Sequence, residues 1–436
     1  MRSSESFLVA VLLIVAVAFS SGCDTGPASR QRVDGDWFES SLVEHNLAIW
    51  LRVSPAANGY FLSRFDRNWV PLKEPQDTLV TQGRLIYAMA TGYEVTGDEA
   101  YLSAMQRGVD FLLKNQRDPE TGTWYRRVDA SGQPTLKGVH RYGNAFVIFG
   151  LAHAARVTGD MELRIPALQT LDREVTALAA HPRAADYFPH RVVPDTSIYK
   201  QLTRQGKFRR AGDQNSLLHL FEASLELYAV APSESLLADI RGIADFVIEV
   251  VSIARGRIVP SWHDRFWNPL LKDGGEVDPG HQLEWAHFLD RAVQLGLPQE
   301  YRAVAERMLE FPLMYGFHPQ EGGLVTGLDY QGNIVADSRY YWEQAEALSA
   351  LMHFAHWNGR DDLWPLFDAQ LSFIRRHMMD TEYGGWFADS RGSAAFGNGD
   401  QLDAWQYKRD VYHIVNMHRE ALQIAGKLKR PVPGGS

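Results

Sequence analysis

The chain has 436 residues, of which 45% are apolar and 22% are charged, and its formal net charge at pH 7 is −9. This length and apolar content permit a large buried core, either as one toroidal domain or as two domains. A net negative chain without an extended basic run is not expected to bind nucleic acid, and the short basic cluster at 427–430 is more typical of a solvated end.

The first 23 residues have the pattern of an export signal. Arg2 precedes an apolar run, Phe7 to Phe19, that is shorter than the roughly 20 residues needed to span a membrane. Cys23 is the only cysteine and follows a small residue, as at a bacterial lipoprotein cleavage site. We therefore predict a lipid anchor at Cys23 and a location in the cell envelope, facing the periplasm or the exterior; ordinary cleavage with an incidental cysteine is the alternative. Residues 24–35 are predicted to be a tether, and 36–430 the folded domain.

Within this domain, short turns recur at intervals of about 60 to 75 residues, the range typical of repeat architectures. Each turn combines a glycine or proline that stops one helix with a polar residue that starts the next. The turns are Thr96–Glu99, Thr158–Met161, Ala231–Glu234, Gly296–Gln299 and Asn358–Asp361. The predicted helices are 36–51, 77–96, 99–115, 142–158, 161–178, 213–230, 234–252, 280–295, 299–315, 340–357, 361–378 and 411–427. Stacked hairpins of this kind can close into a ring, with one helix of each pair inside and one outside.

The connections between these hairpins are longer and alternate with the short turns. Three of them are rich in glycine and aromatic residues and are predicted to form small β-hairpins, at 121–133, 321–333 and 382–396. Long loops at one end of a rigid ring are where a functional site is expected.

The sharpest candidate for catalysis lies in the segment Pro279–Trp285. Pro279 and Gly280 break the chain, so that His281 opens a helix, and Glu284 shares its helical face. Histidine titrates near neutral pH, at about 6.5 when unperturbed, and a neighbouring carboxylate can raise its basicity. The pair is therefore typical of an acid/base catalyst, with a helix-capping histidine as the alternative.

Other helix starts carry similar groups. Arg84 opens an early helix, and its alternative role is an ion pair with Asp77 or Glu74. Asn215 and His219 lie one helical turn apart, with Glu222 three residues further on. His219 could instead be a satisfied core histidine.

Two later helix starts complete the set. Trp342 and Glu346 share one face of a helix, and His413 precedes the last helix. An aromatic core for Trp342 and a solvated position for Glu346 are the structural alternatives.

In this order, the motifs resemble the N-acylglucosamine 2-epimerase family, which includes cellobiose 2-epimerases and mannose or sulfoquinovose isomerases. The resemblance covers about residues 36–425. It implies an all-α fold, an (α/α)6 barrel with small β-hairpins in the long loops of one face. It also implies an isomerase that needs no cofactor and no metal and acts at C2 of a reducing mono- or disaccharide. Such an enzyme removes the C2 proton to form an enediolate and then returns a proton.

The resemblance also implies roles for individual residues. His281 and His413 would alternate as base and acid, with Glu284 holding His281. Arg84 would stabilise the enediolate charge, because a guanidinium is not an acid near neutral pH. His219 would bind sugar hydroxyls or help to open the ring. The remaining sugar-binding residues would be Asn215, Tyr142, Trp342 and Glu346.

The chain departs from the family pattern at two places. The arginine expected about three residues after His413 is replaced by Asn416, with Arg419 following later, and the segment 181–210 has no match in the pattern. Both departures concern the identity of the sugar more than the acid/base pair.

Two other functions stay open from sequence alone. A glycoside hydrolase on the same barrel needs two carboxyl groups about 5 to 10 Å apart, and Glu284, Glu346 and Asp264 are available. A non-catalytic carbohydrate-binding lipoprotein is the other. His353 and His356 could bind a metal, but no third ligand is evident nearby, and the segment 262–265 is a candidate loop at the site.

Overall fold

The computed structural model describes residues 32–72, 77–192, 212–271, 274–392, 408 and 411–430. The predicted export signal, Cys23 and most of the predicted tether lie outside these ranges. In the part of the chain that is described, no helix combines the length and apolar character needed to cross a bilayer.

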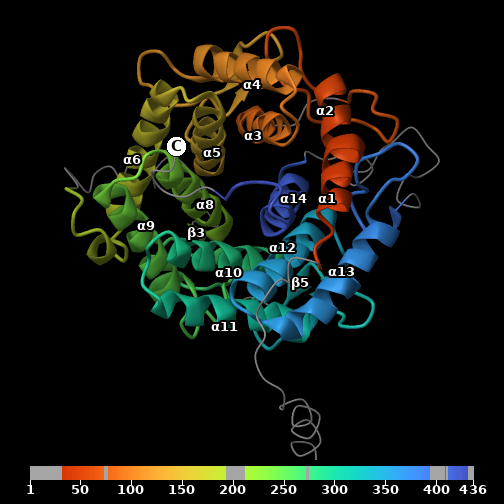
Figure 1. The fold of residues 1–436 in the computed structure, drawn as a ribbon. Helices are drawn as coiled ribbons and strands as arrows, with labels where there is room; N and C mark the ends of the chain where they lie inside the picture. The colour runs from red at the N-terminus through yellow and green to blue at the C-terminus, as the bar shows by residue number, and fades with distance from the viewer. Residues whose placement is uncertain are drawn as a thin grey trace, which may run out of the picture.

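The helices form two concentric rings (Figure 1). The inner ring consists of α3 (Thr78–Thr96), α5 (Arg141–Thr158), α8 (Gln214–Val230), α10 (Pro279–Gln294), α12 (Tyr341–Trp357) and α14 (Tyr412–Ile424). The outer ring consists of α4 (Glu99–Phe111), α6 (Arg164–Ala179), α9 (Glu234–Phe246), α11 (Glu300–Tyr315), α13 (Trp364–His377), and α1 (Gly35–Leu42) with α2 (Ala48–Val53). The predicted all-α (α/α)6 barrel is confirmed.

Short helical extensions adjoin several outer helices. Among the described residues, π-helical turns occur at Val43–Leu47, Leu112–Gln116 and Val247–Val251, and 3-10 turns at Met161–Leu163, Ala185–Tyr187 and Asp361–Leu363.

The ring closes between the two ends of the chain. Helix α1 packs on α14, where His418 Nε2 lies 3.0 Å from Ser41 Oγ and Lys427 Nζ lies 2.7 Å from Glu39 Oε2. The first and last predicted helices therefore pack together as the sixth pair of the ring. Short turns join the helices of the other five pairs.

These short turns have the expected chemistry. Gly97 and Gly159 both adopt left-handed backbone angles, with φ of 68° and 70°, and donate their N–H groups to the carbonyls of Tyr93 and Ala155. Asp98 then accepts from the N–H of Ala100 and caps α4. Glycine tolerates this conformation without steric cost, which is why the sequence marks these turns.

Burial separates the two rings. Fifteen consecutive residues of α3, Thr78 to Gly92, are buried, whereas α4 buries only one face. A helix that is buried on all sides, such as α3, is typical of an element packed between others. A helix that buries one face, such as α4, is typical of an outer layer.

Buried glutamines on the inner helices fix the loops that follow the outer helices. Gln82 Nε2 donates to the carbonyls of Gly59 and Gly108 at 2.8 and 2.9 Å, and its Oε1 accepts from the N–H of Phe61. Gln282 repeats this pattern: its Nε2 donates to the carbonyls of Arg257 and Met308, and its Oε1 accepts from the N–H of Val259. This repeated bonding positions the loops that lead to the N-termini of the inner helices.

Two predicted β-hairpins are present in these loops. Strands β1 (Arg127–Val128) and β2 (Pro134–Leu136) pair antiparallel, as do β5 (Gly327–Leu328) and β6 (Ile334–Ala336). A further pair, β3 (Gly212–Asp213) with β4 (Trp262–His263), joins segments distant in sequence. The third predicted hairpin, 382–396, is described only to residue 392, and there isolated bridges such as Met379–Trp386 replace a strand pair.

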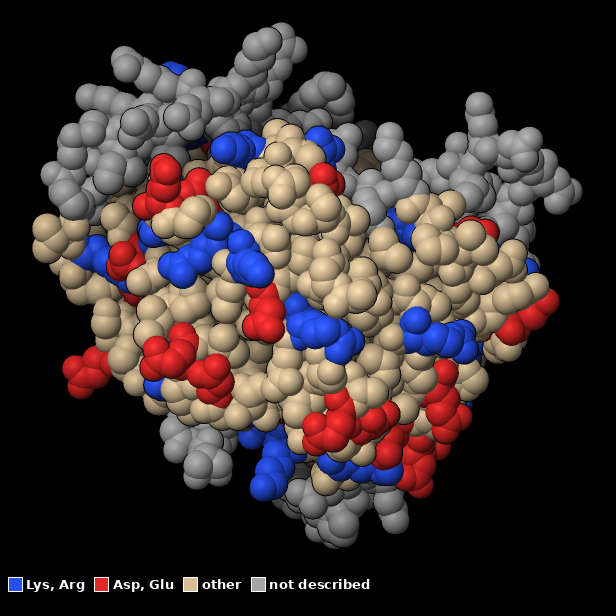
Figure 2. Space-filling view, turned by 90° about the horizontal axis from the view of Figure 1, so that it is seen from above, with Lys and Arg blue, Asp and Glu red and all other residues tan. Residues whose placement is uncertain are grey.

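Acidic and basic side chains are interspersed on the face of the molecule shown in Figure 2. The described surface in that view has no extended basic region, in agreement with the charge balance of the sequence.

Candidate active site

The first turns of the inner helices bring the predicted site residues together. Because each short turn joins the C-terminus of an inner helix to an outer one, all inner helices start at the same end of the barrel. Their rings form a continuous series of contacts: Tyr142 to His219 at 5.2 Å between centroids, His219 to His413 at 6.5 Å, His413 to Trp342 at 5.4 Å, and Trp342 to His281 at 4.7 Å.

His281 is held by an aspartate that sequence reasoning missed. Asp278 caps α10 by accepting the N–H of His281, and its Oδ2 lies 3.1 Å from His281 Nδ1. The predicted pairing of His281 with Glu284 is therefore wrong. The imidazole bends back toward the helix cap, whereas Glu284 continues into the barrel interior. An aspartate directly before Pro-Gly is an N-cap pattern, and this signal could have identified Asp278.

His413 is backed by two buried carboxyl groups. Its Nδ1 lies 2.8 Å from Glu346 Oε1 and 3.9 Å from Glu284 Oε1. Glu346 thus orients the second imidazole, a role different from the sugar contact that the resemblance implied. An imidazole bonded through Nδ1 presents Nε2 to the other side.

Burial is the largest influence on the pKa of His413. It lowers the pKa of His413 well below the ordinary value, and the charges of Arg84, His219 and His281 lower it further. Burial and the neighbouring charge of Glu346 raise the pKa of Glu284 well above its ordinary value. Burial and Glu222 do the same for the pKa of Glu346. His413 is therefore a neutral base near pH 7.

Arg84 points into the same space. Its Nη2 donates to the hydroxyl of Tyr142 at 2.6 Å, and its guanidinium lies 4.3 Å from the ring centroid of Phe146 and 4.6 Å from that of Tyr412. The alternative partner Asp77 pairs with Arg126 instead, and Glu74 lies outside the described residues. Arg84 is thus placed as a buried fixed charge beside the histidines.

His219 belongs to a hydrogen-bonded group deeper in the barrel. Its Nδ1 lies 3.0 Å from Glu222 Oε2, and Glu222 also accepts from the Tyr412 hydroxyl and, at 3.1 Å, from Asn416 Nδ2. Burial raises the pKa of Glu222 to about 8 despite these donors. Tyr412 was missed from sequence, although it adjoins His413.

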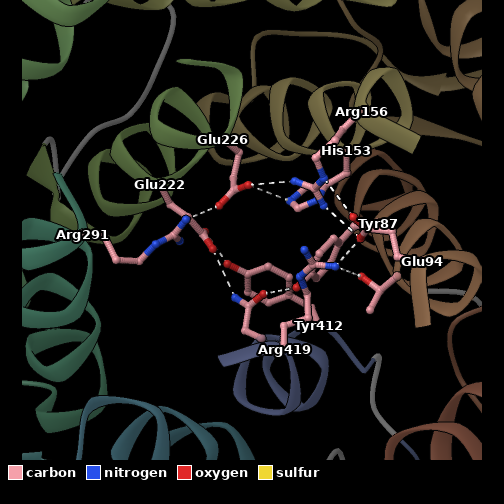
Figure 3. Close-up of polar contacts among 11 residues, drawn as sticks. Tyr87, Glu94, His153, Arg156, Glu222, Glu226, Arg291, Tyr412 and Arg419 are labelled. Atoms are coloured by element: carbon pink, nitrogen blue, oxygen red, sulfur yellow. Dashed lines mark hydrogen bonds and ion pairs between the residues drawn. The ribbon is translucent and has the colours of Figure 1, made fainter. Parts of the chain in front are cut away.

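Ion pairs line the interior below this group (Figure 3). Arg419 bonds Thr91 at 3.1 Å and pairs with Glu94, and Arg291 lies 2.6 Å from Glu226. Asn416, the residue that departs from the family pattern, accepts from the Tyr87 hydroxyl. Arg419 is therefore engaged in this ion-pair network.

Two further candidates have different placements. Asn215 is half-buried in the first turn of α8. In the segment 262–265, His263 is buried with Nε2 at 2.9 Å from the Val251 carbonyl, and Asp264 accepts turn amides from Phe266 and Asn268. Asp264 is engaged in its own turn rather than facing a second carboxylate.

The comparisons with known proteins agree with this geometry. The sequence profile described as N-acylglucosamine 2-epimerase (GlcNAc 2-epimerase) matches residues 59–417. The chain belongs to the N-acylglucosamine 2-epimerase family.

Individual relatives in this family are distant. A cellobiose 2-epimerase of Dictyoglomus turgidum is 23% identical over 358 residues, which are 80% of this chain and 90% of the relative. A D-mannose isomerase of Thermobifida fusca is 26% identical over 72% of this chain and 76% of its own length. Among solved structures, the cellobiose 2-epimerase of Bacillus thermoamylovorans B4167 superimposes with a TM-score of 0.72 at 19% identity, covering 90% of this chain and 99% of that structure.

Proposed function

We propose that this family member interconverts reducing sugars at C2 by carbon-acid chemistry, as a 2-epimerase or an aldose–ketose isomerase. One observation carries the proposal. Two imidazoles from distant parts of the chain, His281 and His413, contact the same indole of Trp342, and each has its own carboxyl partner, Asp278 and Glu346.

The chemistry follows from this arrangement. In the open form of an aldose, the C1 carbonyl acidifies the hydrogen on C2. The neutral imidazole of His413 or His281 takes this proton, and the C–H electron pair moves into an enediolate. The imidazolium on the opposite side returns a proton to C2, which inverts the centre; return of a proton to C1, with transfer of the O2 proton, gives the ketose.

Arg84 supplies the charge that this intermediate needs. A guanidinium held among aromatic rings keeps its positive charge near neutral pH and stabilises developing negative charge in a water-poor site. Trp342 offers an apolar face to the sugar ring between the two histidines.

The substrate class is a reducing mono- or disaccharide. The relatives named cellobiose 2-epimerase, D-mannose isomerase and N-acylglucosamine 2-epimerase support a sugar ligand. A hydrolase is less well supported, because Glu284 and Glu346 lie together behind His413: one oxygen of each carboxyl group and one His413 ring nitrogen are within 4.8 Å of one another. Such carboxyl groups do not face each other across a glycosidic bond.

Solvent exchange tests this proposal. A panel of reducing sugars, including cellobiose, mannose and N-acetylglucosamine, is incubated with the protein in deuterated water. We expect deuterium at C2 of at least one sugar, measured by NMR, with a constant number of reducing ends. Release of new reducing ends without deuterium would support hydrolysis, and neither change with any sugar would favour a binding protein.

We also propose that the protein is exported and lipid-anchored at Cys23, on the basis of the apolar run and the lone cysteine. Metabolic labelling of bacterial cells with a fatty acid is expected to label the wild-type protein in the membrane fraction. Cys23→Ser is expected to lose the label and leave that fraction. Retention of label by this variant would contradict the anchor.

A further inference from the structure

A second group of histidines lies two helical turns beyond the site just described. His287, His353 and Glu420 come from α10, α12 and α14, the same helices that supply His281, Glu346 and His413. Six or seven residues separate the members of each pair along their helix, a spacing of about 10 Å along the axis. On α12 and α14 the spacing of seven residues keeps both members on one helical face, and on α10 His287 lies one turn beyond Glu284. The two groups therefore lie at different depths of the barrel.

The side chains of this deeper group converge tightly. His353 Nδ1 lies 2.9 Å from Glu420 Oε1, and His287 Nε2 lies 3.7 Å from Glu420 Oε2. One ligand atom from each of the three residues falls within 4.8 Å of the others, and all three side chains are buried. A Zn²⁺ ion about 2.1 Å from each ligand separates the ligand atoms by roughly 3.4 Å, so small side-chain movements bring the set to bonding distance.

His287 is the weakly held member of this group, because its ion pair with Glu420 spans 3.7 Å. It is 5% exposed, and within the described residues neither of its ring nitrogens has a hydrogen-bond partner. Its ring lies 4.5 Å from that of His353. A buried imidazole without hydrogen bonds is unfavourable unless another atom bonds to it.

The surroundings have the features of a metal centre's outer shell. His353 Nε2 lies 2.9 Å from Asp290 Oδ2, so a metal on Nδ1 would take the place of the contact between Nδ1 and Glu420 Oε1. Asp290 is fixed in turn by Arg302 at 3.0 Å and Asn358 at 2.9 Å. Trp357 Nε1 donates to Glu420 Oε1 at 2.8 Å. A carboxylate behind a metal-binding histidine orients the ring and makes it a better ligand.

We propose that His287, His353 and Glu420 bind a divalent transition metal of the Zn²⁺ class, with Asp290 as the carboxylate behind His353. Two histidines and one glutamate leave a fourth position, and His287 and Glu420 both line a small, partly open pocket that can hold a water. Because the ligands come from three successive inner helices, the ion would join α10, α12 and α14 next to the place where α14 closes the ring. The proposed sugar chemistry does not depend on it.

The test uses the full chain, freed of metal with a chelator and titrated with Co²⁺ as a spectroscopic probe and with Zn²⁺. We expect one Co²⁺ per chain with the visible absorption of a tetrahedral nitrogen and oxygen site. We expect Zn²⁺ at a hundred times its Kd to raise Tm by about 3 °C. His287→Gln should weaken Co²⁺ binding at least tenfold and lose the Tm shift.

His418→Gln is the matched control, because His418 is a buried histidine on α14 that bonds Ile414 and Ser41 instead. It should bind one Co²⁺ and keep the Zn²⁺-induced shift, whatever its own stability. Equal binding by wild type and His287→Gln would assign the ion to another site and overturn the proposal. Absence of the tetrahedral spectrum in the wild type would overturn it as well, even if the variant does not fold.

Discussion

Replacing His413 by alanine is expected to slow interconversion of the epimers by about 10²–10⁴-fold, the usual contribution of a positioned acid/base group. His413 is the buried imidazole, held by Glu346 at 2.8 Å. Its loss removes proton transfer on one face of the sugar. His281→Ala is expected to have an effect of the same size, since the reaction requires both faces.

The two variants can be separated by solvent exchange at C2. In His413→Ala, His281 can still remove and return the proton of the epimer that faces it. In His413→Ala, deuterium should therefore enter one epimer without inversion. In His281→Ala, it should enter the other epimer, again without inversion. His45→Ala, at an exposed position of the outer ring, should leave both rates unchanged. Normal interconversion by either active-site variant, in a chain whose circular dichroism matches wild type, would contradict the two-base mechanism.

Removal of the charge of Arg84 is expected to have the second largest effect. Arg84→Met should lower kcat by about 10²–10³-fold, as for the loss of one group that stabilises a developing oxyanion. It should also change the pH profile. After burial, Arg84 is the largest cause that lowers the pKa of His413, so its removal raises that pKa.

The direction of this change can be checked. His413 must be neutral to act as a base, and a higher pKa means that it becomes protonated at a higher pH. The acid limb of kcat/KM should therefore move toward neutral pH in Arg84→Met. Arg107→Met, on the exposed face of α4, should change neither kcat nor the profile. A lower kcat with an unchanged acid limb would show that Arg84 acts on the substrate without tuning His413.

Much of the site could be predicted because the relevant signals are local. Pro279 and Gly280 mark the helix start that exposes His281, and Gly97 and Gly159 mark the turns that define the repeat. The partners of the histidines were harder to predict. His281 bonds Asp278, three residues earlier, rather than Glu284, and His413 bonds Glu346, 67 residues away.

The deeper histidine group makes the same point. From sequence, His353 and His356 were the candidate pair with no third ligand, because they share a helix. In the structure, His353 is joined instead by His287 and Glu420 from two neighbouring helices.

The sequence by itself determined the helical repeat, the turns that end each inner helix, and the residue types able to move a proton. These properties follow from glycine, proline and apolar periodicity over a few residues. Only the tertiary structure decided which carboxylate supports which imidazole, and that Arg84 lies among the aromatic rings rather than on Asp77. Closure of the ring sets these pairs, because it brings together residues 67 and 329 positions apart in the chain, through side chains whose directions no local pattern specifies.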